Sequence, residues 1–163
     1  MSARIASAAA LLLATLFAGS CGFHLQGRDP LPQTLATPYV EAADRQSDFV
    51  QGLRKALLAS GAKLTEDRTR ASAVVQVLTD EVTERVLSVS ARNTPREYEL
   101  TYTVRFAVAA NGKTLLEPQE VSVSRDFSFD ERVLLAKENE EAILREALAR
   151  DLVGIVMRRL SSL

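Results

Sequence analysis

Residues 97–108 of this chain read EYELTYTVRFAV, and this stretch decides the fold. Apolar and polar side chains alternate along it, and one face would carry Tyr98, Leu100, Tyr102, Val104, Phe106 and Val108. The other face would carry Glu97, Glu99, Thr101, Thr103 and Arg105. Alternation of this kind, in a stretch rich in β-branched and aromatic residues, predicts a strand of an antiparallel sheet with one buried and one solvated face.

Turn signals on both sides of this stretch predict neighbouring strands. Asn111-Gly112 is a typical two-residue hairpin turn. The strand expected after it carries, on one parity, Val121, Val123, Arg125, Phe127 and Phe129. On the other side, Asn93-Thr94-Pro95 predicts a turn, and residues 72–91 alternate as a further strand with a bend near Asp80-Glu81.

Two helices are expected outside these three strands. Ser47 can cap a helix over residues 48–59, where apolar residues recur at helical spacing, and Ser60-Gly61 supplies its end. Residues 131–160 carry an apolar stripe that predicts a second, longer helix, with a break expected near Lys137.

Residues 38–41, PYVE, predict a short first strand, which completes the order β-α-β-β-β-α. A sheet that is apolar on one face needs a layer that covers this face. We therefore predict the α+β class, in a two-layer sandwich whose mainly antiparallel sheet packs against two helices.

The N-terminal residues 1–20 are predicted to be a signal peptide. Arg4 is the sole charge before Cys21, and an uncharged run rich in alanine and leucine follows it. Residues 18–21, AGSC, resemble a bacterial lipobox, which predicts a covalent lipid on Cys21. The alternatives are an ordinary signal peptide followed by a free thiol, or a cysteine in the core.

The mature chain would then consist of a tether and one domain. Three prolines at positions 30, 32 and 38 predict an extended tether over residues 21–37, followed by a single domain over residues 38–163. Gly22 stands where enteric lipoproteins carry an aspartate as the inner-membrane retention signal. By that analogy we expect a lipid anchor in the outer membrane, on its periplasmic side.

Composition argues against several classes of function. The formal net charge is −1, so no general attraction to nucleic acid is expected. The single cysteine and single histidine argue against a disulfide framework and against clustered metal ligands, and no cofactor is predicted. The chain lacks a glycine-rich phosphate loop and a G-x-S-x-G elbow, so we expect a protein that is not an enzyme.

Two arginines mark a candidate binding site. Arg92 and Arg96 flank the predicted turn at a hairpin tip, and Arg85 lies further down the same strand. Two guanidinium groups on one tip can bind phosphate or carboxylate in bidentate fashion. Alternatively, a charged tip only keeps the hairpin soluble and discourages aggregation through the sheet edge. Lys137 alone carries no prediction.

Three segments resemble the lipopolysaccharide-assembly lipoprotein family LptE. They are CGFHLQG at residues 21–27, REYELTYTV at residues 96–104 and LLAKENEE at residues 134–141. The resemblance implies an outer-membrane lipoprotein that plugs the lipopolysaccharide-translocating barrel LptD, assists its assembly and binds lipopolysaccharide on its way to the outer leaflet. It also implies lipopolysaccharide contacts at Arg92 and Lys137, with Arg96 as an addition.

Two other functions remain open on the residues alone. One is a non-enzymatic scaffold lipoprotein of another envelope machine, such as barrel assembly or cell-wall tethering. The other is a small periplasmic hydrolase that would use Asp80 and Glu84 as a carboxylate pair. Acidic residues beside a strand bend more commonly form a solvated edge.

Overall fold

The computed structural model describes residues 30–128 and 134–163, and the side chains of residues 134–138 are not part of this description. The predicted signal peptide, Cys21 and the first part of the tether lie outside the described residues. The main elements are β1 (Pro38–Ala42), α2 (Asp48–Ala59), β2 (Ala73–Val89), β3 (Pro95–Ala110), β4 (Lys113–Ser128) and α3 (Leu134–Ser161). Short 3-10 helices lie at Gln33–Leu35 and Arg68–Arg70.

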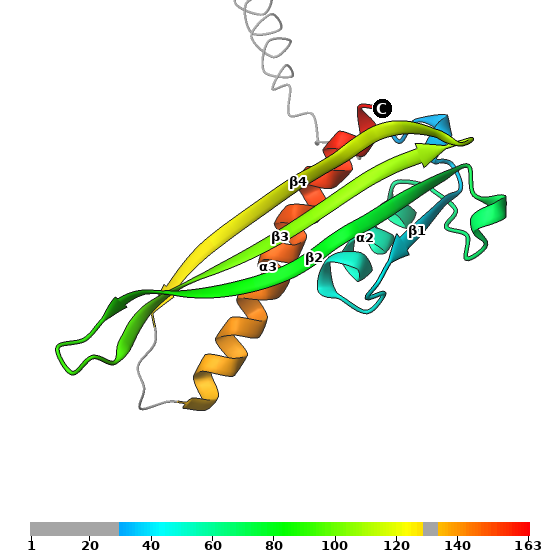
Figure 1. Ribbon diagram of the computed structural model, residues 1–163. Coiled ribbons are helices and arrows are strands. Elements are labelled where there is room, and N and C mark those ends of the chain that lie inside the picture. The colour runs from blue at the N-terminus through cyan, green and yellow to red at the C-terminus, as the bar shows by residue number, and fades with distance from the viewer. Residues whose placement is uncertain (1–29, 129–133) are drawn as a thin grey trace, which may run out of the picture.

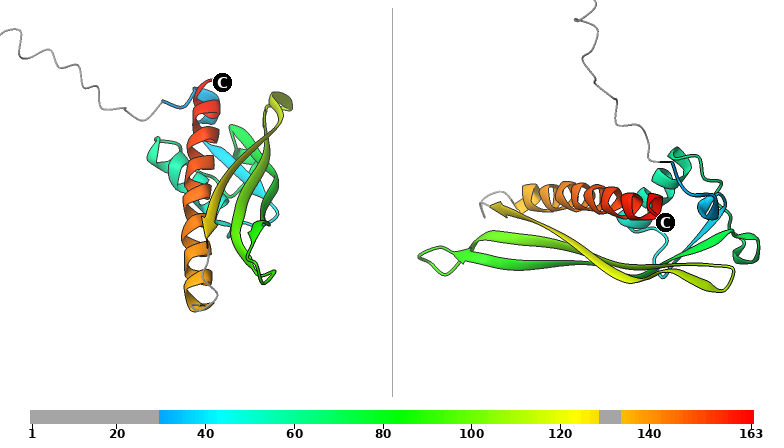
Figure 2. Two further views of the ribbon diagram at one scale, coloured as in Figure 1. Left: turned by 90° about the vertical axis from the view of Figure 1, so that its left-hand side faces the viewer. Right: turned by 90° about the horizontal axis from the view of Figure 1, so that it is seen from above.

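The four strands form one sheet in the order β1-β2-β3-β4. β1 pairs in parallel with β2, because α2 forms the crossover between them, and the other two pairs are antiparallel. Figures 1 and 2 show α2 and α3 on the same face of this sheet. The predicted α+β sandwich with the order β-α-β-β-β-α is therefore confirmed.

The core lies between the alternating face of β3 and the two helices. All six apolar residues that the sequence placed on this face are buried: Tyr98, Leu100, Tyr102, Val104, Phe106 and Val108. The helices contribute Phe49, Leu53 and Leu57 from α2 and Leu148, Leu152, Val156 and Leu160 from α3. Each such side chain contributes about 1.5–3 kcal/mol on burial, so this face is the main source of stability.

The residues expected to begin and end the helices and strands largely do so in the structure. The Ser47 hydroxyl accepts a hydrogen bond from the Val50 amide at 3.1 Å, which caps α2. Gly61, just after α2, has φ +93°, and the Asn111-Gly112 turn has φ values of +51° and +72°. Both hairpin positions are left-handed, which agrees with the predicted tight turn.

β2 runs without a break where a bend was expected near Asp80-Glu81. Instead, its pairing with β3 shifts between Val77 and Thr79, so that Leu78 is an extra, exposed residue. A bulge of this kind reverses the inward and outward alternation. As a result, Val77 faces the core on one side of the bulge and Asp80 takes this face on the other.

α3 is continuous from Leu134 to Ser161, so the break expected near Lys137 is wrong. Residues 134–150 contain strong helix formers and neither glycine nor proline, which explains the continuity. Bonds from arginines tie α3 to its surroundings: Arg145 to Asp48 at 2.7 Å, Arg125 to Asp151 at 2.7 Å and Arg159 to Gln119 at 2.6 Å.

Candidate functional site

The end of the β2–β3 hairpin forms an arm, which we define as residues 85–99, and its last pairs extend beyond both β1 and β4. β1 pairs with β2 only as far as Val77, and β4 leaves β3 at Glu97. The last pairs of the arm, up to Val89 and Pro95, therefore involve two strands alone. Figure 1 shows the end of the arm extending past β4, at the end of the molecule where α3 begins.

At the tip of the arm, which we define as residues 90–94, Ser90 and Thr94 close a three-residue hairpin loop over residues 91–93. The Ser90 amide donates to the Thr94 carbonyl at 2.7 Å, and the Asn93 amide donates to the Ser90 carbonyl at 2.9 Å. Asn93 has φ +61°, the left-handed conformation that closes such a loop. Asparagine tolerates this conformation better than most residues, so the sequence NTP is suited to this tip.

The Ser90 side chain stiffens the tip further. Its hydroxyl oxygen accepts hydrogen bonds from the backbone amides of Arg92, at 3.3 Å, and Thr94, at 3.2 Å. These hydrogen bonds fix the backbone before and after Asn93, while the Arg92 side chain is exposed. A rigid loop with an exposed charge is a common way to present a binding group.

The arginines of the arm differ in whether their charge is already used. Arg85 forms an ion pair with Glu99 at 2.9 Å across the hairpin. Arg92 and Arg96 are both exposed, and neither forms an ion pair within the described part of the chain. The structure therefore brings the two predicted arginines to one tip and leaves their charges available.

The third predicted binding residue, Lys137, lies in the first turns of α3. Its side chain is outside the description, so its contact with the tip stays a prediction. The start of α3 and the tip lie at the same end of the molecule in both views of Figure 2. The backbone arrangement is thus compatible with a shared site for Arg92 and Lys137.

Asp80 serves the fold rather than a catalytic pair. Its carboxylate accepts hydrogen bonds from the Ser47 hydroxyl and, at 2.7 Å, from the Tyr102 hydroxyl. The Tyr102 oxygen in turn accepts from the Phe49 amide at 3.3 Å. Burial and the bond to Asp80 raise the pKa of Tyr102. Because Asp80 is half-buried and tied to the start of α2, the expected solvated edge does not describe it.

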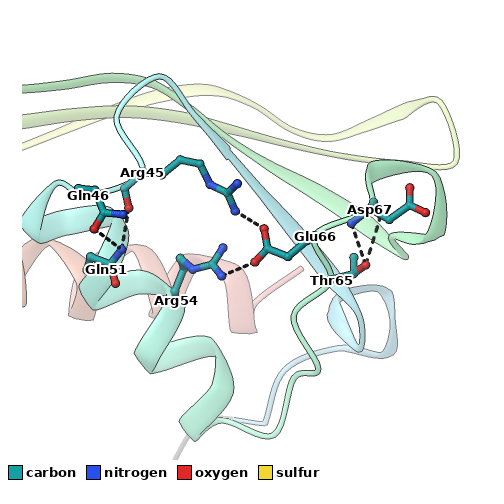
Figure 3. Close-up of polar contacts among 7 residues, drawn as sticks. All are labelled: Arg45, Gln46, Gln51, Arg54, Thr65, Glu66 and Asp67. Carbon is teal, nitrogen blue, oxygen red and sulfur yellow. Dashed lines mark hydrogen bonds and ion pairs between the residues drawn. The ribbon is translucent and has the colours of Figure 1, made fainter.

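A second polar cluster, which sequence reasoning missed, joins α2 to the loop before β2 (Figure 3). Glu66 forms ion pairs with both Arg54 and Arg45. Hydrogen bonds from Arg54 and then from Arg45 lower the pKa of Glu66. The Gln51 side chain also donates to the Arg45 carbonyl at 2.7 Å. These arginine charges are compensated inside the chain, so the cluster fastens a loop and offers no free cationic site.

Other kinds of site receive no support from the described residues. No three acidic, histidine or cysteine side chains in residues 30–128 and 134–163 come close enough to hold a metal ion. Within the same ranges, no helix has both the length and the apolar character to cross a membrane.

Comparison with known proteins decides the family. A model of the lipopolysaccharide-assembly family LptE matches residues 35–160, which covers the sheet, both helices and the arm. The chain belongs to this family. LptE proteins are lipopolysaccharide-assembly lipoproteins of the outer membrane and are not enzymes, so the predicted role in lipopolysaccharide assembly, the non-enzymatic class and the outer-membrane location are confirmed. Membership also implies the partnership with LptD, without showing the contact itself.

Individual relatives agree with this assignment. The LPS-assembly lipoprotein LptE of Pectobacterium atrosepticum is 28% identical over 149 residues, which are 91% of this chain and 80% of that protein. The LptE protein of Yersinia enterocolitica is 25% identical, with 91% of this chain and 72% of that protein covered.

Solved structures show the same fold. Lipoprotein B of Nitrosomonas europaea has a TM-score of 0.71 at 26% identity, over 86% of this chain and 91% of that chain. Rare lipoprotein B of Shewanella oneidensis has a TM-score of 0.68 at 25% identity, over 77% and 94% respectively.

Proposed function

We propose that this LptE protein binds the phosphates of lipopolysaccharide through Arg92 and Arg96 at the tip of its arm, together with Lys137 at the start of α3. Lipopolysaccharide carries clustered phosphates, and guanidinium groups bind phosphate through paired hydrogen bonds. A basic tip on a chain of net charge −1 suits a local contact of this kind.

The observation that carries this proposal is that two arginines without an ion pair in the described chain lie together at one exposed hairpin tip. Arg85, Arg45 and Arg54 are compensated by Glu99 or Glu66. At the tip, Arg92 and Arg96 lack such partners among the described residues. Two like charges without counter-ions repel each other mildly, and an anionic ligand removes this repulsion.

We further propose that the domain occupies the lumen of the barrel LptD. The sheet face that points away from the helices is polar: the Thr101 hydroxyl lies 2.8 Å from that of Ser124, and Arg85 pairs with Glu99. Barrel interiors are polar and contain water. This face could therefore lie against a lumen wall without burying uncompensated apolar groups.

A lipid on Cys21 would fix the direction of the molecule. The described chain begins near the end where α3 finishes, opposite the arm (Figures 1 and 2). The residues between Cys21 and Pro30 can span at most about 30 Å. An anchor in the periplasmic leaflet would thus hold the near end of the domain and leave the tip directed away from it.

The test combines charge reversal with partner binding. We expect Arg92→Asp with Lys137→Asp to weaken lipopolysaccharide binding at least tenfold, because both attractive charges become repulsive. Co-purification of LptD from detergent-solubilised outer membranes should stay stoichiometric. Unchanged lipopolysaccharide affinity would exclude the tip as the binding site, and a missing or different barrel would exclude the proposed plug.

Arg158→Asp provides the matched control. Arg158 is exposed on the last turns of α3, at the end of the molecule opposite the tip, and has no ion pair among the described residues. Arg158→Asp lowers the net charge by as much as each of the two substitutions in the Arg92→Asp, Lys137→Asp variant. An equal loss of binding in this control would mean that net charge, rather than the tip, governs the affinity.

A further inference from the structure

Exposed apolar side chains lie directly below the basic tip. Val86 is 45% exposed, Leu87 is 41% exposed and Val89 is 54% exposed, and we call these three residues the apolar strip. Three large aliphatic side chains exposed within four residues of one strand are unusual, and exposed apolar surface of this kind can mark a binding surface. A strand that carries them at an unpaired edge also risks aggregation unless a ligand or partner covers it.

Val86 continues the apolar face of the core. Val86 lies opposite Tyr98 in the β2–β3 register. The Tyr98 ring is buried and stacks on Phe127, with 5.4 Å between ring centroids. Toward the tip, the apolar surface therefore passes from buried rings to the exposed side chain of Val86.

Charge and apolar surface follow each other over a short distance. Val86 and Val89 are three residues apart, which is about 10 Å along a strand. Arg92 lies beyond Val89, in the tip, and Arg96 lies alongside on β3, between the partners of Ser88 and Val89. The arm thus carries an apolar segment followed by a cationic end, which matches an amphiphile with apolar chains next to an anionic head.

The polar interior of a barrel does not match this strip. A water-filled lumen suits the hydroxyl and charged side chains of the outer sheet face. In the same lumen, the three aliphatic side chains of the strip would stay exposed to water, which is unfavourable. An acyl chain removes this apolar surface from water, and the free cations then lie beside its phosphorylated head.

We propose that the apolar strip, Val86, Leu87 and Val89, binds the acyl chains of lipopolysaccharide while Arg92 and Arg96 bind its phosphates. This inference rests on the proposed lipopolysaccharide binding at the tip and adds a second contact of different chemistry. The arm then holds the ligand across the boundary between its polar head and its chains.

The experiment compares lipopolysaccharide with its fully deacylated form, which keeps the phosphates. The variant is Val86→Thr with Val89→Thr, because threonine keeps the shape and strand preference of valine but adds a hydroxyl. We expect the full-length variant to bind intact lipopolysaccharide about tenfold more weakly, the size expected when two half-exposed valines lose apolar contact. Binding of the deacylated form should change less than about twofold, since no acyl chain is present.

Two further variants separate the contributions. Arg92→Asp with Arg96→Asp should weaken binding of both forms, because both carry phosphates. Leu115→Thr replaces an exposed apolar residue of β4 near the Asn111-Gly112 turn, at the opposite end from the tip, and should leave both affinities unchanged. Equal unfolding midpoints for wild type and variants would show that binding, rather than folding, is being measured.

The possible failures are distinguishable. If the valine variant binds intact lipopolysaccharide like wild type while the arginine variant does not, the acyl contact is overturned and phosphate binding stands. If wild type binds neither form, the proposed function itself fails. If the valine variant loses binding to phosphatidylglycerol vesicles as strongly as to lipopolysaccharide, the strip serves a general membrane surface, and the inference is overturned.

Discussion

The two halves of β2 show how differently one strand can be used. In its first half, Ala73, Val75 and Val77 are buried between β1, β3 and the helices. In its second half, beyond Leu78, β1 is no longer alongside, and Val86, Leu87 and Val89 are exposed. The first half completes its own core, whereas the second keeps apolar side chains and cations for something outside the chain.

This contrast separates stability from function along a single hairpin. Changes in the first half should affect folding, and changes to the exposed side chains near the tip of the arm should affect binding with little cost in stability. The following four predictions test this separation, in order of expected effect.

The largest effect is expected for Phe106→Ala, compared with Val86→Thr. Phe106 is fully buried on β3, and loss of a buried phenylalanine costs about 3–5 kcal/mol of unfolding free energy. Val86→Thr should cost less than about 1 kcal/mol, because its side chain is half exposed in the free protein. Urea denaturation of both variants measures the difference. Similar costs would mean that the arm is part of the core, contrary to the separation.

An intermediate effect is expected for Tyr102→Phe, which lies where the two halves of β2 meet. The change leaves Asp80 and the Phe49 amide without the tyrosine hydroxyl, and an unsatisfied half-buried group costs about 1–3 kcal/mol. The control is Tyr39→Phe, because the Tyr39 hydroxyl has no hydrogen bond within the described residues. A cost in Tyr39→Phe equal to that in Tyr102→Phe would contradict the role of the Asp80 network.

The same tyrosine predicts a pH dependence at alkaline pH. Burial and the bond to Asp80 raise the pKa of Tyr102 in the folded state. The stabilising contribution of Tyr102 is therefore complete below the pKa of tyrosine in the unfolded chain, which is about 10. It is lost as the pH rises above this pKa. Unfolding free energies measured from pH 8 to pH 11 should fall more steeply for wild type than for Tyr102→Phe. Parallel curves would show that Tyr102 does not titrate differently in the two states.

Much of the fold was predictable because its signals are local. The alternation in residues 97–108, the Asn111-Gly112 turn and the Ser47 cap each act within a few residues of chain. The bulge at Leu78 was not predictable, because it depends on how two strands of different regularity match each other. The role of Asp80 also depends on partners distant in sequence, Ser47 and Tyr102.

The position of the candidate site was predictable from the sequence, but which of its arginines form ion pairs was not. Turn residues placed Arg92 and Arg96 at a tip, whereas Arg85 looks equally basic in the sequence. Its pairing with Glu99 follows from the hairpin register, because the two register shifts around Ser88 cancel and the pairing is regular from Val86 down to Thr79. An assignment of Asn93 as the left-handed residue would have fixed this register and revealed the pair. The Arg45–Glu66–Arg54 cluster had no such local signal, because its members lie on separate elements.

The smallest effect on stability, and the sharpest test of the tip, is expected for Asn93→Ala. Alanine in the left-handed conformation costs about 1–2 kcal/mol relative to glycine, so the loop should loosen locally. Hydrogen exchange at the Ser90 and Thr94 amides should become faster, and lipopolysaccharide binding should weaken several-fold because Arg92 and Arg96 are less well held. Asn93→Gly keeps the conformation available and should preserve both properties.

Asn111→Ala imposes the same backbone strain on the other hairpin, since Asn111 has φ +51°. It should destabilise the protein by a similar amount and leave lipopolysaccharide binding unchanged, because that turn lies at the opposite end of the sheet from the tip (Figure 1). If both alanine variants weaken binding equally, the affinity follows global stability rather than the geometry of the tip. If only Asn93→Ala does so, a rigid loop that presents two free arginines is what the arm contributes.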